Sequence, residues 1–161
     1  MNSNHILVTG SSGFIGSAVV RRLIKSGRVV RPTSRRSIDK LTNAFGVPVT
    51  RFDVIEDIES KNEVFHGVKT LIHCATPNDI KSREADGGLP LAVSGTYRLI
   101  EEAIRHGIKR IIFLSTLQVY GTELTGSVNE LSPIKNFQSY NFLATKLVYK
   151  ILSYRFIDFK L

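Results

Sequence analysis

The chain reads Thr9-Gly10-Ser11-Ser12-Gly13-Phe14-Ile15-Gly16 directly after an apolar run at residues 5–8. A segment with the apolar spacing of an amphipathic helix follows at residues 14–26. The glycines are spaced as G-x-x-G-x-x-G. The first permits a tight turn, the second lets backbone N–H groups approach an anion, and the third lets the helix pack closely on the strand. The stretch therefore predicts a strand, a phosphate-binding turn and a helix, in that order.

An anion bound at this turn would lie at the N-terminus of the helix. The first N–H groups of a helix have no partner within the helix, and the helix dipole adds partial positive charge there. We therefore expect a diphosphate to bind here, in contact with Gly10, Ser11, Ser12, Gly13, Phe14, Ile15 and Gly16. A glycine-rich turn without a ligand is the alternative, and the order of strand, turn and helix disfavours it.

Apolar, β-branched runs alternate with segments of helical spacing along the rest of the chain. The expected strands are 5–8, 28–33, 47–52, 70–74, 110–114 and 157–161. The expected helices are 14–26, 55–65, 89–106 and 139–155, and glycines at 27, 67 and 107 are placed to end the first three. This alternation predicts an α/β fold of the Rossmann type, a doubly wound parallel sheet with helices on both faces.

Length and composition favour one globular domain, residues 1–161, because hydrophobic residues make up 42% and charged residues 22% of the chain. Cys74 is the single cysteine, so no internal disulfide can form and a reducing compartment fits. The four histidines lack the spacing of a metal site on a helix, and we expect no metal. No apolar run approaches the roughly 20 residues that span a bilayer, and the first residues lack the order of a secretory signal. We therefore expect a cytoplasmic protein without a membrane segment.

Positive charge is concentrated in one part of the chain. The net charge is +8, and seven basic residues but no acidic residue lie between Arg21 and Arg36. This stretch predicts an anionic partner. It contains no nucleic-acid-binding motif and no aromatic residue on which bases could stack. A phosphorylated cofactor is therefore favoured over nucleic acid.

Several segments together resemble the extended short-chain dehydrogenase/reductase family, which includes sugar-nucleotide epimerases and dehydratases. They are the turn T-G-S-S-G-F-I-G, Asp53-Val54, His73-Cys74-Ala75-Thr76, the helical segment 93–103 and the strand and loop at 111–121. The resemblance implies an NAD(P) cofactor in contact with Asp53, Val54, Cys74, Ala75 and Thr76. It covers nearly all of the chain and ends inside the expected last strand, so we expect the family's C-terminal substrate region to be absent.

The end of the second expected strand bears on which cofactor binds. An Asp or Glu about 20 residues past the glycines accepts a hydrogen bond from the ribose 2′-hydroxyl of NAD. This chain has Ser34-Arg35-Arg36 there instead. A guanidinium can bind the 2′-phosphate of NADP with two charge-assisted hydrogen bonds. We therefore expect NADP in preference to NAD, with solvated loop charges as the alternative.

The family resemblance also implies a catalytic set, which this chain matches in part. Thr116 stands at the position of the family's substrate-orienting hydroxyl, and Lys146 stands at that of its lysine, which also binds the nicotinamide ribose. Phe142 occupies the position of the tyrosine that exchanges the proton. Tyr140 lies six residues before Lys146, about 240° around a helix, and can serve only if it lies in the preceding loop and turns inward.

Three hypotheses for the function follow. The first is an epimerase, dehydratase or reductase that moves hydride between NADP(H) and a carbon of a nucleotide sugar. The second is an NADP-binding module without chemistry, which Phe142 favours, as does Ala92 at a position where the family usually has Asn. The third is an inactive truncated remnant. By the same resemblance, helices 89–106 and 139–155 correspond to those that pair in the family's homodimers.

Overall fold

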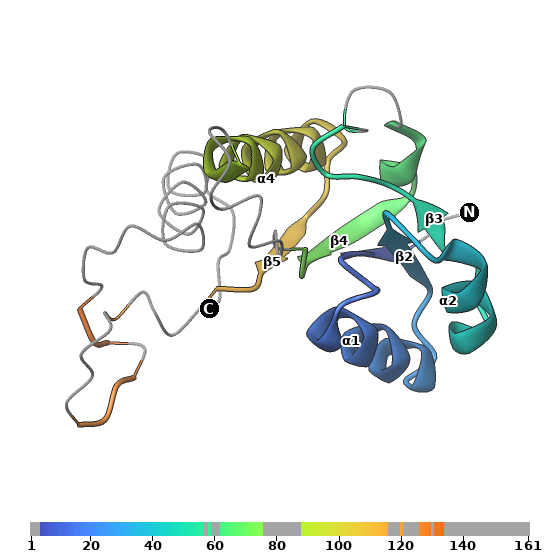
Figure 1. The fold of residues 1–161 in the computed structure, drawn as a ribbon, viewed down its shortest axis with the longest axis horizontal. Helices are drawn as coiled ribbons and strands as arrows, with labels where there is room; N and C mark the ends of the chain where they lie inside the picture. The colour runs from blue at the N-terminus through green and yellow to red at the C-terminus, as the bar shows by residue number, and fades with distance from the viewer. Residues whose placement is uncertain are drawn as a thin grey trace.

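The sheet consists of five parallel strands in the order β3-β2-β1-β4-β5 (Figure 1). The computed structural model describes residues 4–56, 58, 62–75, 88–115, 120, 126–129 and 131–133, with the backbone alone for 88–93. The strands are β1 (His5–Thr9), β2 (Val30–Ser34), β3 (Thr50–Arg51), β4 (Val68–His73) and β5 (Arg110–Phe113). This is the strand order of a Rossmann-type sheet, so the predicted fold class is confirmed.

Helices cover both faces of the sheet (Figure 1). They are α1 (Phe14–Lys25), α2 (Ile38–Phe45), the short 3-10 helix η1 (Asn62–Phe65) and α4 (Gly88–Arg105). Successive side chains of a strand point to opposite faces. Leu7 therefore packs with Leu99 of α4, whereas its neighbour Val8 packs with Val20 of α1 and Phe45 of α2. Because helices cover both faces, the central strand β1 reads as the apolar run Ile6-Leu7-Val8 and not as an alternating pattern.

The ends expected for the first helix and for helix 89–106 are confirmed by backbone geometry. Gly27, Gly67 and Gly107, which follow α1, η1 and α4, have φ angles of 71°, 72° and 71°. The amide of Gly27 donates to the carbonyl of Ile24, which closes the last turn of α1. Within the described residues, no helix combines the length and apolar character needed to cross a membrane.

Two elements between β2 and β3 differ from the prediction. Helix α2 was not expected, although Ile38, Leu41 and Phe45 recur at helical spacing and pack against the sheet. The expected strand 47–52 is reduced to Thr50–Arg51. Pro48 carries no N–H for a strand ladder, and the amide of Val49 is instead bonded to the Thr42 side chain of α2 at 3.1 Å. The residues at 47–49 therefore form the connection between α2 and β3 and not a strand.

The expected helix 55–65 was also wrong within the described residues. A turn is found at residues 54–56, and η1 provides a single 3-10 turn before β4. Asp53 explains the start of this segment, because its Oδ1 accepts the amide of Ile55 at 2.8 Å. This bond holds the turn that follows Asp53. The expected strand 157–161 and helix 139–155 lie outside the described residues.

Backbone packing fixes the glycine-rich turn between β1 and α1. A Cβ on Gly10 would lie 2.6 Å from the amide nitrogen of Ala75, just beyond β4, and the φ of Gly10 is 71°. A Cβ on Gly16 would collide with the carbonyl oxygen of Gly10. The turn is thus held between β4 and α1 at positions where no side chain fits, as its sequence predicts.

We expect Gly16→Ala to lower the free energy of unfolding by about 1–3 kcal/mol, because the added methyl must displace backbone. Urea unfolding followed by circular dichroism measures this change. The control is Ala18→Ser, which adds one heavy atom at an exposed position of the same helix and should cost no more than about 0.5 kcal/mol. Equal stability of the two variants would contradict the packing argument.

Candidate functional site

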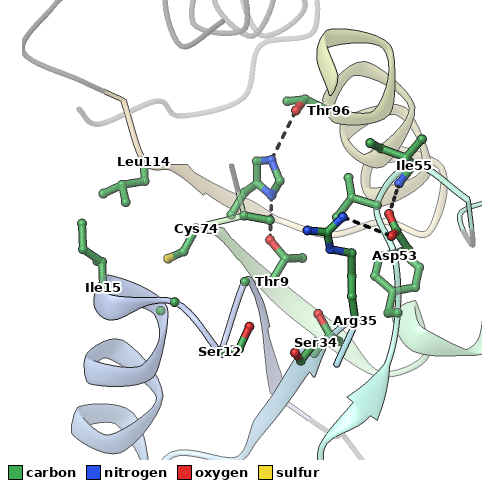
Figure 2. Close-up of a pocket in the computed structure, with 18 of the residues that line it drawn as sticks. Thr9, Ser12, Ile15, Ser34, Arg35, Asp53, Ile55, Cys74, Thr96 and Leu114 are labelled. Atoms are coloured by element: carbon green, nitrogen blue, oxygen red, sulfur yellow. Dashed lines mark hydrogen bonds and ion pairs between the residues drawn. The ribbon is translucent and has the colours of Figure 1, made fainter. Parts of the chain in front are cut away.

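A cavity of about 470 Å³ lies at the carboxyl ends of the central strands. Its walls come from the ends of β1, β2 and β4, the start of α1, the loop after β3, and Thr96 of α4 (Figure 2). Helix α1, which follows β1, and helix α4, which follows β4, lie on opposite faces of the sheet, so a crevice opens between these two strands. In open α/β sheets such a crevice is the usual place for a ligand.

The start of α1 presents backbone N–H groups to this cavity. The first helical hydrogen bond runs from the amide of Ser17 to the carbonyl of Gly13, so the amides of Phe14, Ile15 and Gly16 come before it. In this described segment, Gly13 provides no side-chain cap and the first turn contains no acidic residue. Phe14 is 94% exposed and leaves the helix start open. This arrangement can bind an anion such as a diphosphate.

Most residues predicted to contact the cofactor lie around this one cavity. Its lining includes Gly10, Ser12, Gly13, Phe14, Ile15, Gly16, Ser34, Arg35, Asp53, Val54, Cys74 and Ala75. The structure does not bring Ser11 to the cavity. Ser11 is buried, its amide donates to the carbonyl of Thr33 at 3.1 Å, and its hydroxyl donates to the carbonyl of Val8 at 3.0 Å. The Ser11 side chain therefore stabilises the glycine-rich turn by its bond to β1.

The remaining predicted residues lie elsewhere. Arg36 is exposed and does not line the cavity, although its backbone is held by the Ser34 hydroxyl, which donates to the Arg36 carbonyl at 2.9 Å. Four predicted residues and the phenylalanine at the tyrosine position lie outside the described residues: Thr76, Thr116, Tyr140, Lys146 and Phe142. The roles suggested for them stay predictions.

An ion pair marks one end of the cavity. Nη1 of Arg35 lies 3.6 Å from Oδ2 of Asp53, and the second carboxylate oxygen accepts the amide of Ile55 (Figure 2). Asp53 is thus held in place by backbone, whereas the Arg35 side chain is 54% exposed. The pair lies just past the ends of β2 and β3, where the sequence predicts the adenosine end of a dinucleotide.

The other basic residues of the stretch between Arg21 and Arg36 do not gather at the cavity. Arg31 donates through Nη1 to the carbonyls of Val64 at 2.7 Å and His66 at 2.8 Å, at the C-terminal end of η1. The guanidinium of Arg21 lies over the ring of Phe45, 5.4 Å from its centroid. These two arginines therefore stabilise the fold, and within the described residues Arg35 alone of this stretch lines the cavity.

Apolar side chains line the opposite end of the cavity. Figure 2 shows Ile15, Leu114 and Cys74 gathered there, away from Arg35. Cys74 is partly buried and packs against the apolar cluster that contains Val8. Burial raises the pKa of its thiol, so the sulfur stays protonated at neutral pH. This end suits an uncharged ring better than a charged group.

Sequence reasoning gave no individual role to His73, at the centre of the site. Its ring is fully buried, with Nδ1 2.6 Å from Oγ1 of Thr9 and Nε2 3.3 Å from Oγ1 of Thr96. It also packs against the ring of Phe113 at 5.6 Å. Burial lowers the pKa of His73 to about 4, so the ring is neutral. The histidine thereby joins β1, β4 and α4 beneath the cavity.

Folding should depend on pH through His73. The folded chain takes up this proton only near pH 4, where the pKa of His73 lies, whereas the unfolded chain takes it up near its ordinary value of 6.5. Acidification from pH 7 to pH 4 therefore favours the unfolded chain by up to about 3 kcal/mol through this residue. We expect His73→Gln to lose less stability than the parent protein over this range, in urea unfolding at each pH. His66→Gln, which removes an exposed histidine, is the matched control, and identical slopes for both variants would exclude the burial of His73 as the cause.

The chain matches the model of the NAD dependent epimerase/dehydratase family over residues 6–152. It is 31% identical over 150 residues to the dTDP-glucose 4,6-dehydratase of Streptomyces griseus, an alignment that covers 86% of this chain and 46% of that protein. It is 35% identical over 119 residues to cinnamoyl-CoA reductase 1 of Oryza sativa subsp. japonica, with 69% and 34% covered. The chain thus spans less than half the length of these curated relatives.

Solved structures agree with this assignment. The chain superposes with a TM-score of 0.70 and 27% identity on a short-chain dehydrogenase/reductase superfamily protein from Agrobacterium tumefaciens with bound NAD, covering 90% of this chain and 44% of that one. The fold is also that of the dTDP-glucose 4,6-dehydratase of Streptomyces venezuelae with NAD bound, at a TM-score of 0.79 and 23% identity, with 96% and 53% covered. From its glycine-rich turn, its strand order and the family match over residues 6–152, this chain belongs to the NAD dependent epimerase/dehydratase family.

Proposed function

We propose that this chain binds a nicotinamide dinucleotide across the cavity, with NADP(H) preferred, and forms the cofactor-binding part of an oxidoreductase. The open start of α1 carries this proposal, because its amides can bind the diphosphate that joins the two halves of such a cofactor. The adenosine would lie toward Arg35 and Asp53, and the nicotinamide toward Ile15 and Leu114. The NAD-bound relatives support the cofactor class.

The residues after β2 support NADP. The strand ends at Ser34, and the next two residues are Arg35 and Arg36, with no carboxylate to accept a ribose 2′-hydroxyl. The Ser34 hydroxyl is bonded to both the carbonyl and the amide of Arg36, which fixes the backbone of this short segment. With the backbone fixed, the entropy cost of binding a 2′-phosphate falls on the Arg35 side chain alone.

The proposed reaction moves hydride between the cofactor and a carbon of a small-molecule substrate. When bound, the nicotinamide ring accepts or donates the hydride. By family resemblance, Thr116 would orient the substrate, Lys146 would bind the nicotinamide ribose, and Tyr140 would exchange the substrate's proton. A nucleotide sugar is the substrate class we propose, since dTDP-glucose and UDP-glucose appear in the names of relatives. A cytoplasmic homodimer completes the proposal.

A second candidate is an NADP-binding module without catalysis. Phe142 favours it, because a phenyl ring at the family's tyrosine position has no proton to exchange. Such a module would retain the cavity, the glycine-rich turn and the pair of Arg35 with Asp53. Cofactor binding would then be its whole function, and occupancy of the site would itself be a redox signal.

Calorimetric titration with NADP+ and NAD+ tests the cofactor proposal. We expect Arg35→Gln to weaken NADP+ binding by about tenfold or more, since a charge-assisted hydrogen bond is lost, and to change NAD+ binding much less. The control is Arg22→Gln, which removes the same charge from the last turn of α1 and should leave both affinities close to the parent values. If folded protein binds neither cofactor at millimolar concentration, the proposal is wrong.

Turnover assays separate the two candidate functions. With NADP(H) and a panel of nucleotide sugars, an enzyme should show turnover that Tyr140→Phe abolishes, because the phenol that exchanges the proton is removed. Phe142→Ala should change that turnover little, because the phenyl ring takes no part in proton transfer. Tight NADPH binding with no turnover on any substrate would support the binding module.

A further inference from the structure

Asp53 and Arg35 come together because β2 and β3 are neighbours in the sheet. Thr33 pairs with Thr50, and the amide of Phe52 donates to the carbonyl of Ser34 at 3.0 Å. The residue after β2 therefore lies beside the residue that follows Phe52. This places a carboxylate 3.6 Å from the guanidinium that, in the proposed function, binds the cofactor's 2′-phosphate.

Asp53 is the fixed member of this pair. Its Oδ1 accepts the amide of Ile55 at 2.8 Å, and the carbonyl of Ile55 accepts Nη2 of Arg98 from α4 at 3.0 Å. Helix α4 also packs tightly here, because a Cβ on Gly95 would lie 3.1 Å from the carbonyl oxygen of Val54. The Asp53 side chain is 18% exposed and the Arg35 side chain 54%, so the guanidinium can move more freely than the carboxylate.

We infer that Asp53 is a specificity-determining residue that limits the preference of this site for a 2′-phosphate. The inference rests on the proposed function and adds a residue to it. A bound 2′-phosphate must draw Arg35 away from the carboxylate or share it, and it brings its own negative charge close to a carboxylate that cannot withdraw. A half-exposed ion pair is weak, so the phosphate still binds, but with reduced affinity.

The same pair explains how the site can accept NAD. A ribose with a free 2′-hydroxyl brings no charge to Arg35, and the guanidinium then keeps Asp53 as its partner. With NAD bound, the Arg35 guanidinium next to the ribose still has Asp53 as its counter-charge. NAD binding therefore carries no electrostatic penalty at this point. The chain is therefore expected to prefer NADP moderately and not to exclude NAD.

Asp53→Asn tests the inference. Asparagine keeps the oxygen that accepts the Ile55 amide, so the loop after β3 can remain folded, but the negative charge beside Arg35 is lost. Any contact of residue 53 with the adenine is common to both cofactors and cancels in the ratio of their dissociation constants. We expect the preference for NADP+ over NAD+, measured by calorimetry, to rise about two- to fivefold. An unchanged or lower preference overturns the inference.

Two further variants identify the cause. Asp39→Asn removes the same charge from an exposed position in the first turn of α2, and an equal rise in NADP+ preference there would mean that net charge is responsible and not the pair. In an Arg35→Gln background, Asp53→Asn should change the preference clearly less than in the parent protein. If the proposed function is itself wrong, the result differs from both outcomes. The parent protein would then bind neither cofactor, or Arg35→Gln would leave its NADP+ affinity unchanged.

Discussion

The close packing of the glycine-rich turn between β4 and α1 is the constraint on which the cavity depends. Gly10 lies against the backbone of Ala75, and Gly16 lies against the carbonyl of Gly10, so three backbone segments meet where no Cβ fits. Larger residues there would move α1 away from the strands and carry its first amides away from the cavity. The site is built largely from backbone, and the absence of two side chains is what brings that backbone together.

Much of the fold could be predicted where a strand carries an apolar run, as in β1 and the middle of β4. The runs that contain Leu7 and Leu71 are recognisable for this reason, and the glycine at 107 marks the end of α4. Helix α2 was harder to predict from the sequence, since it has only eight residues and lies between two short strands. The segment after Asp53 has the apolar spacing of a helix, yet within the described residues it forms a turn at 54–56 and the single 3-10 turn η1.

The residues that line the cavity were predictable where backbone geometry requires a residue type, and less so where contacts are made across the sheet. Gly13 and Arg35 could be identified from their distance to a strand end. The role of His73 could not be predicted, because it depends on the hydroxyl groups of Thr9 and Thr96, which lie 64 and 23 residues away in the sequence. The pairing of Arg35 with Asp53 likewise requires knowing that β3 lies next to β2.

The side chains of the cavity carry almost no net charge, although the chain as a whole carries +8. Arg35 and Asp53 balance each other, His73 is neutral above its pKa of about 4, and burial raises the pKa of the Cys74 thiol so that it stays protonated. A diphosphate in this cavity must therefore be bound mainly by the amide dipoles at the start of α1. Dipoles bind well only when their direction is fixed. Affinity for the diphosphate should thus depend more on the position of the turn than on the basic residues of the surface. Because the packing of Gly10 and Gly16 sets that position, it also determines how tightly the diphosphate binds.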